Sequence, residues 1–221
     1  KYGLKVDQSG FHEAMNAHRL ASKNKLITDQ SINPNQDIYA TILNNLIEQN
    51  HFSSTDDVHS PYGPHLIESE IISMLTPSGQ PITHLKTGDT VDIVLSNTPF
   101  YIESGGQIGD TGTIQSINHN WIIEIHKVYE PISGLIIHNG KITTGTPTIG
   151  DNCTASIHIQ NRLSIMRNHT GTHILHQELK SLLGNHVRQA GSLVEPERLR
   201  FDFSHPQALT KIEINNVQSL V

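Results

Sequence analysis

Six short runs with the residue pattern of β-strands lie between residues 66 and 159, and they constrain the fold more than any other feature. Turn-forming residues separate these runs, for example Thr87-Gly88-Asp89 and Ile149-Gly150-Asp151, and Asn139-Gly140 is predicted to be another turn. Six strands at this spacing indicate a small closed barrel. We expect the strands at residues 66–75, 90–96, 112–117, 121–129, 134–138 and 152–159.

Helical patterns flank the barrel on both sides. Before it, apolar stripes predict helices over about 6–25 and about 37–49. A polar loop follows the second helix, and we expect its histidines to be solvated. These are His51, His59 and His65. The predicted fold class is therefore α+β, with a helical segment and linker in 1–64, the β-barrel in 65–160 and a further α+β part in 161–221.

The stretch from Arg162 to Gly184 predicts a long helix that carries two histidines. Its apolar residues recur at helical spacing, and Gly184 is a stop signal. These apolar residues are Leu163, Met166, Ile174, Leu175, Leu179 and Leu182. His169 and His173 would share one helix face about 6 Å apart, as in two-histidine metal sites. The chain has 15 histidines, however, so two solvent-facing polar positions would produce the same spacing.

Cys153 is the one cysteine of the chain. Its neighbours have the pattern of a buried strand, so we interpret it as a core thiol rather than a metal ligand. A tetrahedral zinc held by the histidine pair would therefore need other ligands. A single cysteine excludes an internal disulfide framework and is compatible with a reducing cytosol.

A glycine-rich stretch, TPFYIESGGQIGDTGTI, occupies residues 98–114 within the barrel. Its four glycines, at positions 105, 106, 109 and 112, permit positive φ and a close approach of another backbone or of a ligand. Bulges that turn a barrel corner would explain them. Alternatively, the stretch forms a concave surface where Gln107 offers an amide to a small ligand. The lysine and Ser/Thr of a Walker loop are missing.

Charge and hydropathy narrow the possible partners. The net charge of −6 argues against wholesale binding of nucleic acid. Of the 15 basic and 21 acidic residues, 7 and 5 lie in 161–221, which leaves 8 and 16 for 1–160. A polyanion would therefore prefer the C-terminal part. No apolar run approaches the roughly 20 residues that span a bilayer, so we expect no membrane partner.

The C-terminal part predicts a hairpin and a last helix. Residues 192–194 and 199–203 alternate around Glu195-Pro196-Glu197, and Thr210 with Glu213 forms a capping-box pattern. The sequence begins with Lys1 and stops at Val221 within this helix. We therefore expect it to be part of a longer chain.

Three stretches together resemble the middle and editing region of the alanyl-tRNA synthetase family. They are TPFYIESGGQIGDTG, RNHTGTHILHQELKSLLGNHVRQAGSLV and RLRFDFSH. The start, YGLKVDQSGFHEAMNAHR, also resembles the segment that precedes the barrel in that family. The resemblance spans nearly the whole chain and is weakest between about residues 25 and 65.

The resemblance implies a translation-type β-barrel followed by the N-terminal part of an editing domain shared with threonyl-tRNA synthetase. It implies that His169 and His173 are zinc ligands, and that Gln107 borders a deacylation pocket as a catalytic residue. Gly105, Gly106 and Thr170 are candidate substrate contacts, although Thr170 and Thr172 also suit helix capping and packing.

For the full-length enzyme the resemblance implies a cytoplasmic ligase that joins alanine to tRNA(Ala) with ATP and Mg²⁺. It implies that this region deacylates Ser-tRNA(Ala) and Gly-tRNA(Ala). Three features depart from the family: its second zinc pair, Cys-x-x-x-His, and its aminoacylation domain are absent, and Gly171 stands where alanine is common. We therefore expect this chain alone to bind zinc weakly, if at all, and to be inactive in hydrolysis.

Two alternatives stay open. A free-standing editing hydrolase of the same superfamily is disfavoured by the helical segment ahead of the barrel and by the start at Lys1. A non-catalytic RNA-binding barrel module predicts tRNA binding without any dependence on metal.

Overall fold

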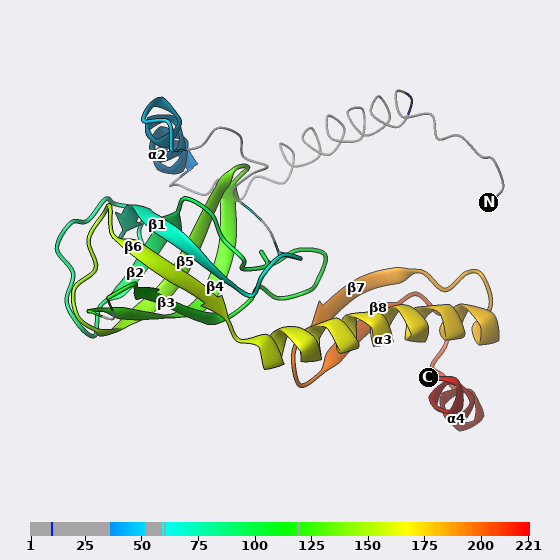
Figure 1. The fold of residues 1–221 in the computed structure, drawn as a ribbon. Helices are drawn as coiled ribbons and strands as arrows, with labels where there is room; N and C mark the ends of the chain where they lie inside the picture. The colour runs from blue at the N-terminus through cyan, green and yellow to red at the C-terminus, as the bar shows by residue number, and fades with distance from the viewer. Residues whose placement is uncertain (1–9, 11–35, 52–58, 60, 119) are drawn as a thin grey trace. The chain divides into compact units, whose positions relative to one another are not determined.

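The computed structural model describes residues 10, 36–51, 59, 61–118 and 120–221, and residues 37–221 form one compact unit (Figure 1). The helix predicted over 6–25 lies outside the described residues apart from Gly10. The second predicted helix is confirmed as α2, Gln36–Glu48. Tyr39, Ile42 and Leu46 of α2 are buried in the same core as the barrel strands, so α2 packs on the barrel.

Six strands close into a barrel, as predicted, and the structure shows that they are antiparallel and follow the order β1-β2-β5-β4-β3-β6 (Figure 1). They are β1 (Leu66–Leu75), β2 (Thr90–Leu95), β3 (Gly112–Ser116), β4 (Ile122–Ile132), β5 (Leu135–Thr144) and β6 (Asn152–Ile157). Apolar side chains such as Ile93, Ile123 and Ile137 fill the interior and are fully buried. Burial of these side chains is the main stabilising contribution to this part of the chain.

The predicted turn at Asn139-Gly140 is wrong. Both residues lie inside β5, and β4 and β5 form a longer hairpin than expected. Gly140 pairs with Ile125, and a Cβ on it would lie 2.4 Å from the carbonyl oxygen of Glu124. This glycine therefore allows close packing of two strands and does not serve a turn.

The chain leaves the barrel through the long helix α3 (Ile159–Leu183), which ends before Gly184 as predicted. It begins three residues earlier than expected. The sequence did not predict this start, because the residue before the helix, His158, forms no side-chain cap and is not a typical capping residue. Four residues of α3 are buried: Arg162, Ile165, Thr172 and Leu179. Several predicted apolar positions, including Met166 and Ile174, are instead 49% and 43% exposed.

The remaining elements form a small layer beside α3. The predicted hairpin is confirmed as β7 (Gln189–Val194) and β8 (Leu199–Phe203), and the capping box of Thr210 and Glu213 opens α4 (Lys211–Leu220). A second, smaller core contains Leu179, Val187 and Val217. The α+β fold class is therefore confirmed. Among the residues that the structure describes, no helix is long and apolar enough to cross a membrane.

Candidate functional site

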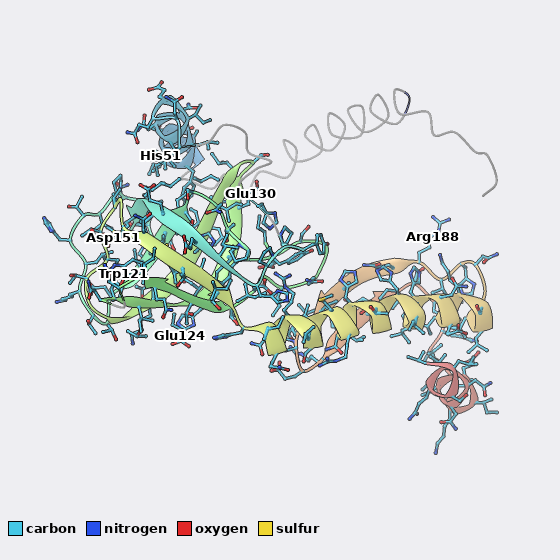
Figure 2. All side chains as sticks on the ribbon, in the orientation of Figure 1. His51, Trp121, Glu124, Glu130, Asp151 and Arg188 are labelled. Atoms are coloured by element: carbon cyan, nitrogen blue, oxygen red, sulfur yellow. The ribbon has the colours of Figure 1, made fainter. Side chains whose placement is uncertain are left out.

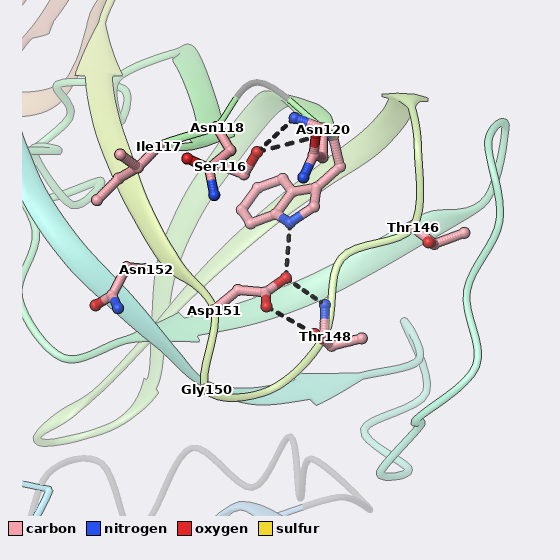
Figure 3. Close-up of a pocket in the computed structure, with 10 residues that line it drawn as sticks. Ser116, Ile117, Asn118, Asn120, Thr146, Thr148, Gly150, Asp151 and Asn152 are labelled. Carbon is pink, nitrogen blue, oxygen red and sulfur yellow. Dashed lines mark hydrogen bonds between the residues drawn. The ribbon is translucent and has the colours of Figure 1, made fainter.

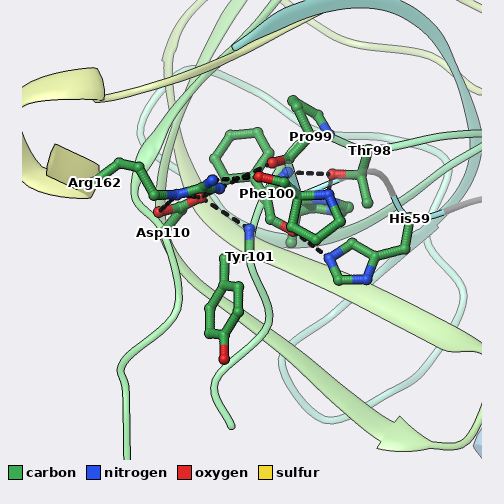
Figure 4. A network of polar contacts seen from close by, with 9 residues as sticks. His59, Thr98, Pro99, Phe100, Tyr101, Asp110 and Arg162 are labelled. Atoms are coloured by element: carbon green, nitrogen blue, oxygen red, sulfur yellow. Dashed lines mark hydrogen bonds and ion pairs between the residues drawn. The ribbon is translucent and has the colours of Figure 1, made fainter. Parts of the chain in front are cut away.

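A buried ion pair joins the first turn of α3 to the glycine-rich segment of the barrel (Figure 4). The guanidinium of Arg162 donates to Asp110 and also to the carbonyl oxygens of Pro61 and Pro99. Asp110 in turn accepts a 2.8 Å hydrogen bond from the backbone N–H of Tyr101. The pair is 52 residues apart in sequence, and no local pattern predicted it.

The glycine-rich segment extends the small hairpin by backbone pairing. The N–H of Val194 donates to Gly106 O at 2.7 Å, and the N–H of Ile108 donates to Val194 O at 3.2 Å. Gln107 is thus paired in parallel with Val194 at the end of β7. Gly106 has φ +85°, and a Cβ there would lie 2.5 Å from the carbonyl oxygen of Ser192. The absence of a side chain at Gly106 therefore allows the backbone of the glycine-rich segment to lie close to the backbone of β7 at Ser192.

Gln107, His169 and His173 lie in one hydrogen-bonded row. Gln107 Oε1 is 2.6 Å from His169 Nδ1, and His169 Nε2 is 3.1 Å from His173 Nε2. An amide oxygen only accepts, so His169 Nδ1 carries the hydrogen, and the Nε2 of a neutral ring keeps its lone pair. Gln107 is buried, with 7% of its surface exposed. It therefore fixes the tautomer and the orientation of the His169 ring.

The spacing of the two histidines fits one zinc ion. Two nitrogens bound to one tetrahedral zinc at about 2.0–2.1 Å lie about 3.3–3.4 Å apart, close to the separation found here. A hydrogen bond to the other ring nitrogen is the usual support of a ligating histidine, and Gln107 supplies it to His169. Within the described ranges there is no cluster of three or more His, Cys, Asp or Glu residues suited to a metal.

A small cavity of about 50 Å³ opens beside the pair and is lined by Gly105, His169, His173 and His176 among others. His176 Nε2 is buried without a hydrogen-bond partner, and its ring packs on Phe201 at 4.9 Å between centroids. A buried nitrogen without a partner is costly, so it is ready to bind a polar group that enters the cavity. His176 lies seven residues after His169, and the sequence alone assigned it no role.

The helix threonines are engaged within α3. Thr170 Oγ1 donates to Met166 O at 3.0 Å, and Thr172 Oγ1 donates to Asn168 O at 2.8 Å. Such bonds back to residue i−4 satisfy the hydroxyl inside the helix. Thr170 lines a second cavity, of about 230 Å³, which also borders Gln107 and His169. Gly105 lines the small cavity, whereas Gly106 lines neither of these two cavities.

The other candidate ligands lie elsewhere. Cys153 is fully buried in the barrel, and burial raises the pKa of its thiol to about 12, so it is a core residue as predicted. His59 was expected to be solvated, which is wrong. It is half-buried, its Nε2 donates to Phe100 O at 3.0 Å, and burial lowers its pKa (Figure 4).

A polar depression of about 600 Å³ lies at the end of the barrel away from α3 (Figures 2 and 3). Asp151 there accepts a 2.7 Å hydrogen bond from Trp121 Nε1 and two more from Thr148. Both carboxylate oxygens are thus used to hold the turn before β6. This arrangement gives the aspartate a structural role.

Comparisons with known proteins give consistent results. Residues 1–161 match the family described as tRNA synthetases class II (A). Proteins named Alanine--tRNA ligase from Chloroflexus aurantiacus and Bacillus velezensis are 37% and 38% identical over 98% and 99% of this chain. The chain covers 22% and 23% of their lengths. A relative of the same name from Fervidobacterium nodosum is 49% identical over 59% of this chain and 15% of its own length.

Proposed function

The chain belongs to the class II alanyl-tRNA synthetases, and from this premise we propose that it carries part of the editing site of an alanine--tRNA ligase. The whole protein would use ATP and Mg²⁺ to join alanine to tRNA(Ala) in the cytoplasm. The region described here would deacylate Ser-tRNA(Ala) and Gly-tRNA(Ala). The row formed by Gln107, His169 and His173 is the observation that carries the proposal.

The chemistry requires such a second site. A pocket shaped for alanine cannot strongly reject glycine, which is smaller, or serine, which adds one hydroxyl, because each difference is worth only about 1–3 kcal/mol. Synthetases for small side chains therefore hydrolyse the wrong ester at a separate position. A small cavity beside a pair of metal-binding histidines suits that task.

His169 and His173 would hold zinc through their Nε2 atoms. When bound, zinc lowers the pKa of a water molecule or polarises the ester carbonyl. Gln107 Oε1 holds the proton of His169 on Nδ1 and so directs Nε2 toward the ligand position. The amide nitrogen of Gln107 would then orient the attacking water or the substrate, because the amide oxygen is used by His169.

The cavity beside His176 would receive the side chain of the wrong amino acid. Its volume of about 50 Å³ suits a hydroxymethyl group, and the unpartnered Nε2 of His176 could accept the hydrogen of a serine hydroxyl. Thr170 and Thr172 would hold the shape of α3 in this region, because their hydroxyls are bonded within the helix.

The test is hydrolysis of seryl-tRNA(Ala) with and without added Zn²⁺. It would compare this chain with the same chain joined to the segment that follows the matching region in the longer relatives. The joined form should hydrolyse the ester, and His169→Ala with His173→Ala should abolish the activity. A control, His65→Ala, alters an exposed histidine and should have no effect. Unchanged activity in the double variant would reject the zinc role, and metal-independent tRNA binding without hydrolysis would favour an RNA-binding module.

A further inference from the structure

Two tyrosines stand beside the candidate site without a role in it. Tyr62 is 89% exposed, and Tyr101 is partly buried. Both line the cavity of about 230 Å³ that borders Gln107 and His169, and both line a neighbouring cavity of about 410 Å³. An exposed aromatic ring at a cavity mouth offers a large flat surface for another ring.

The backbones that carry these tyrosines are held in place. Arg162 donates to Pro61 O, directly before Tyr62, and to Pro99 O, two residues before Tyr101. Asp110 accepts from the N–H of Tyr101 itself (Figure 4). A buried ion pair thus anchors both segments, so the rings are presented from a fixed backbone rather than from a free loop.

The position of the first cavity indicates what it binds. The substrate under the proposed function, on which this inference rests, is an amino acid esterified to the terminal ribose of an RNA. When the ester lies at His169, the terminal base is only the width of one sugar away. The cavity that shares His169 and Gln107 with the site therefore adjoins the ester position, and it is lined by two tyrosine rings and Met166.

We propose that Tyr62 and Tyr101 form a stacking site for the unpaired 3′-terminal base of the RNA. Single-stranded RNA ends are commonly bound by stacking their bases on aromatic side chains. Arg162, the cation at this cavity, is neutralised by Asp110, so the cavity suits an uncharged base. Glu103 and Glu130 line the neighbouring cavity and would repel a phosphate there. The base therefore occupies the first cavity, and the phosphate chain leaves by another route.

The experiment uses two uncharged RNA hairpins, one ending in CCA and one lacking the terminal adenosine. Their dissociation constants are measured by fluorescence anisotropy with this chain and with Tyr62→Ala, Tyr62→Phe and Ile149→Ala. Ile149 is an exposed apolar residue at the turn before β6 and serves as the matched control. Tyr62→Ala should weaken binding of the CCA hairpin about tenfold, the size expected from losing one stacked base. Tyr62→Phe and Ile149→Ala should bind like the unchanged protein.

The shortened hairpin supplies the decisive comparison. With it, the difference between Tyr62→Ala and the unchanged protein should disappear, because the ring then has no base to stack on. NMR of tyrosine-labelled protein should show the Tyr62 and Tyr101 ring signals shifting only with the CCA hairpin. An equal loss for both hairpins, equal binding of all variants, or no binding at all overturns the inference. Failure of the seryl-tRNA(Ala) assay alone, with this binding pattern intact, would reject the deacylation and leave the base site standing.

Discussion

The barrel and the helix–hairpin part that follows it are built on very different cores. Among the described residues, one cluster of 25 buried hydrophobic residues spans the barrel part and α2. The second cluster, around α3, α4 and the hairpin, has three. Yet the histidine pair lies in the sparsely packed part, and the residue that orients it comes from the barrel. The densely packed region thus holds the orienting residue, and the sparsely packed region carries the candidate metal ligands.

The largest effect should follow from removing the ion pair that links the two regions. Arg162→Met leaves the Asp110 carboxylate buried without its charge partner and should lower the free energy of unfolding by about 3–5 kcal/mol, measured by urea denaturation. Adding Asp110→Leu should recover part of the loss, since the uncompensated charge is removed. A loss below about 1 kcal/mol in the single variant would mean that the regions are held together by other contacts.

The contrast in packing can be tested with one truncation in each region. Ile123→Ala, at a fully buried barrel position, should cost about 2–5 kcal/mol because it leaves a cavity in a dense core. Leu182→Ala, at a 39% exposed position of α3, should cost less than about 1 kcal/mol. Similar losses for the two variants in thermal or urea unfolding would contradict the view that only the barrel is tightly packed.

The barrel should also respond to pH through His138, which is fully buried at its centre. Burial lowers the pKa of His138 to about 4, and its ring accepts from Thr98 Oγ1 while Nδ1 donates to Ile93 O. Between pH 6.5 and 4 the unfolded chain binds a proton that the folded chain excludes, so stability falls as the pH falls. The loss should reach about 3 kcal/mol.

A variant isolates the contribution of this histidine. His138→Gln should lower stability at pH 7 but should remove this share of the decline between pH 6.5 and 4, as measured by urea unfolding across that range. The exposed His65 provides the control, and His65→Gln should keep the full pH dependence. An identical slope in His138→Gln and the unchanged protein would show that other groups cause the decline.

The smallest effect concerns a second side-chain contact between the regions, the hydrogen bond between Gln107 and His169. Gln107→Leu removes the acceptor for His169 Nδ1 and should weaken zinc binding about 10- to 100-fold in isothermal titration of the extended form used for deacylation. Gln107→Glu keeps an acceptor and should bind zinc nearly as well as the unchanged protein. Gln177→Leu, at an exposed position of α3, is the matched control. Equal affinities for all three variants would leave Gln107 without a positioning role.

Local patterns predicted much of this fold. Strand alternation gave the six-stranded barrel, the stop at Gly184 gave the end of α3, and Thr210 with Glu213 gave the start of α4. The same local rules wrongly predicted a turn at Asn139-Gly140. A glycine that allows a neighbouring strand to approach closely cannot be distinguished, from the sequence alone, from a glycine that forms a turn.

Contacts between distant segments could not be predicted from spacing. The helical repeat in α3 indicated a buried apolar face, but the buried face carries Arg162 and Thr172, and Met166 is exposed. Which face a helix buries depends on what packs beside it, and beside Arg162 that is Asp110 from the barrel. The histidine spacing and the resemblance singled out Gln107, His169 and His173, but only the structure reveals which Gln107 atom contacts His169.

The close approach at Gly106 has a consequence for how the two regions depend on each other. Even one methyl group at this position would act as a spacer between the barrel and β7, and the ring of His169 would lose its support without any change in the histidines themselves. A substitution at residue 106 would therefore weaken the proposed metal site by displacing its support, without touching either histidine.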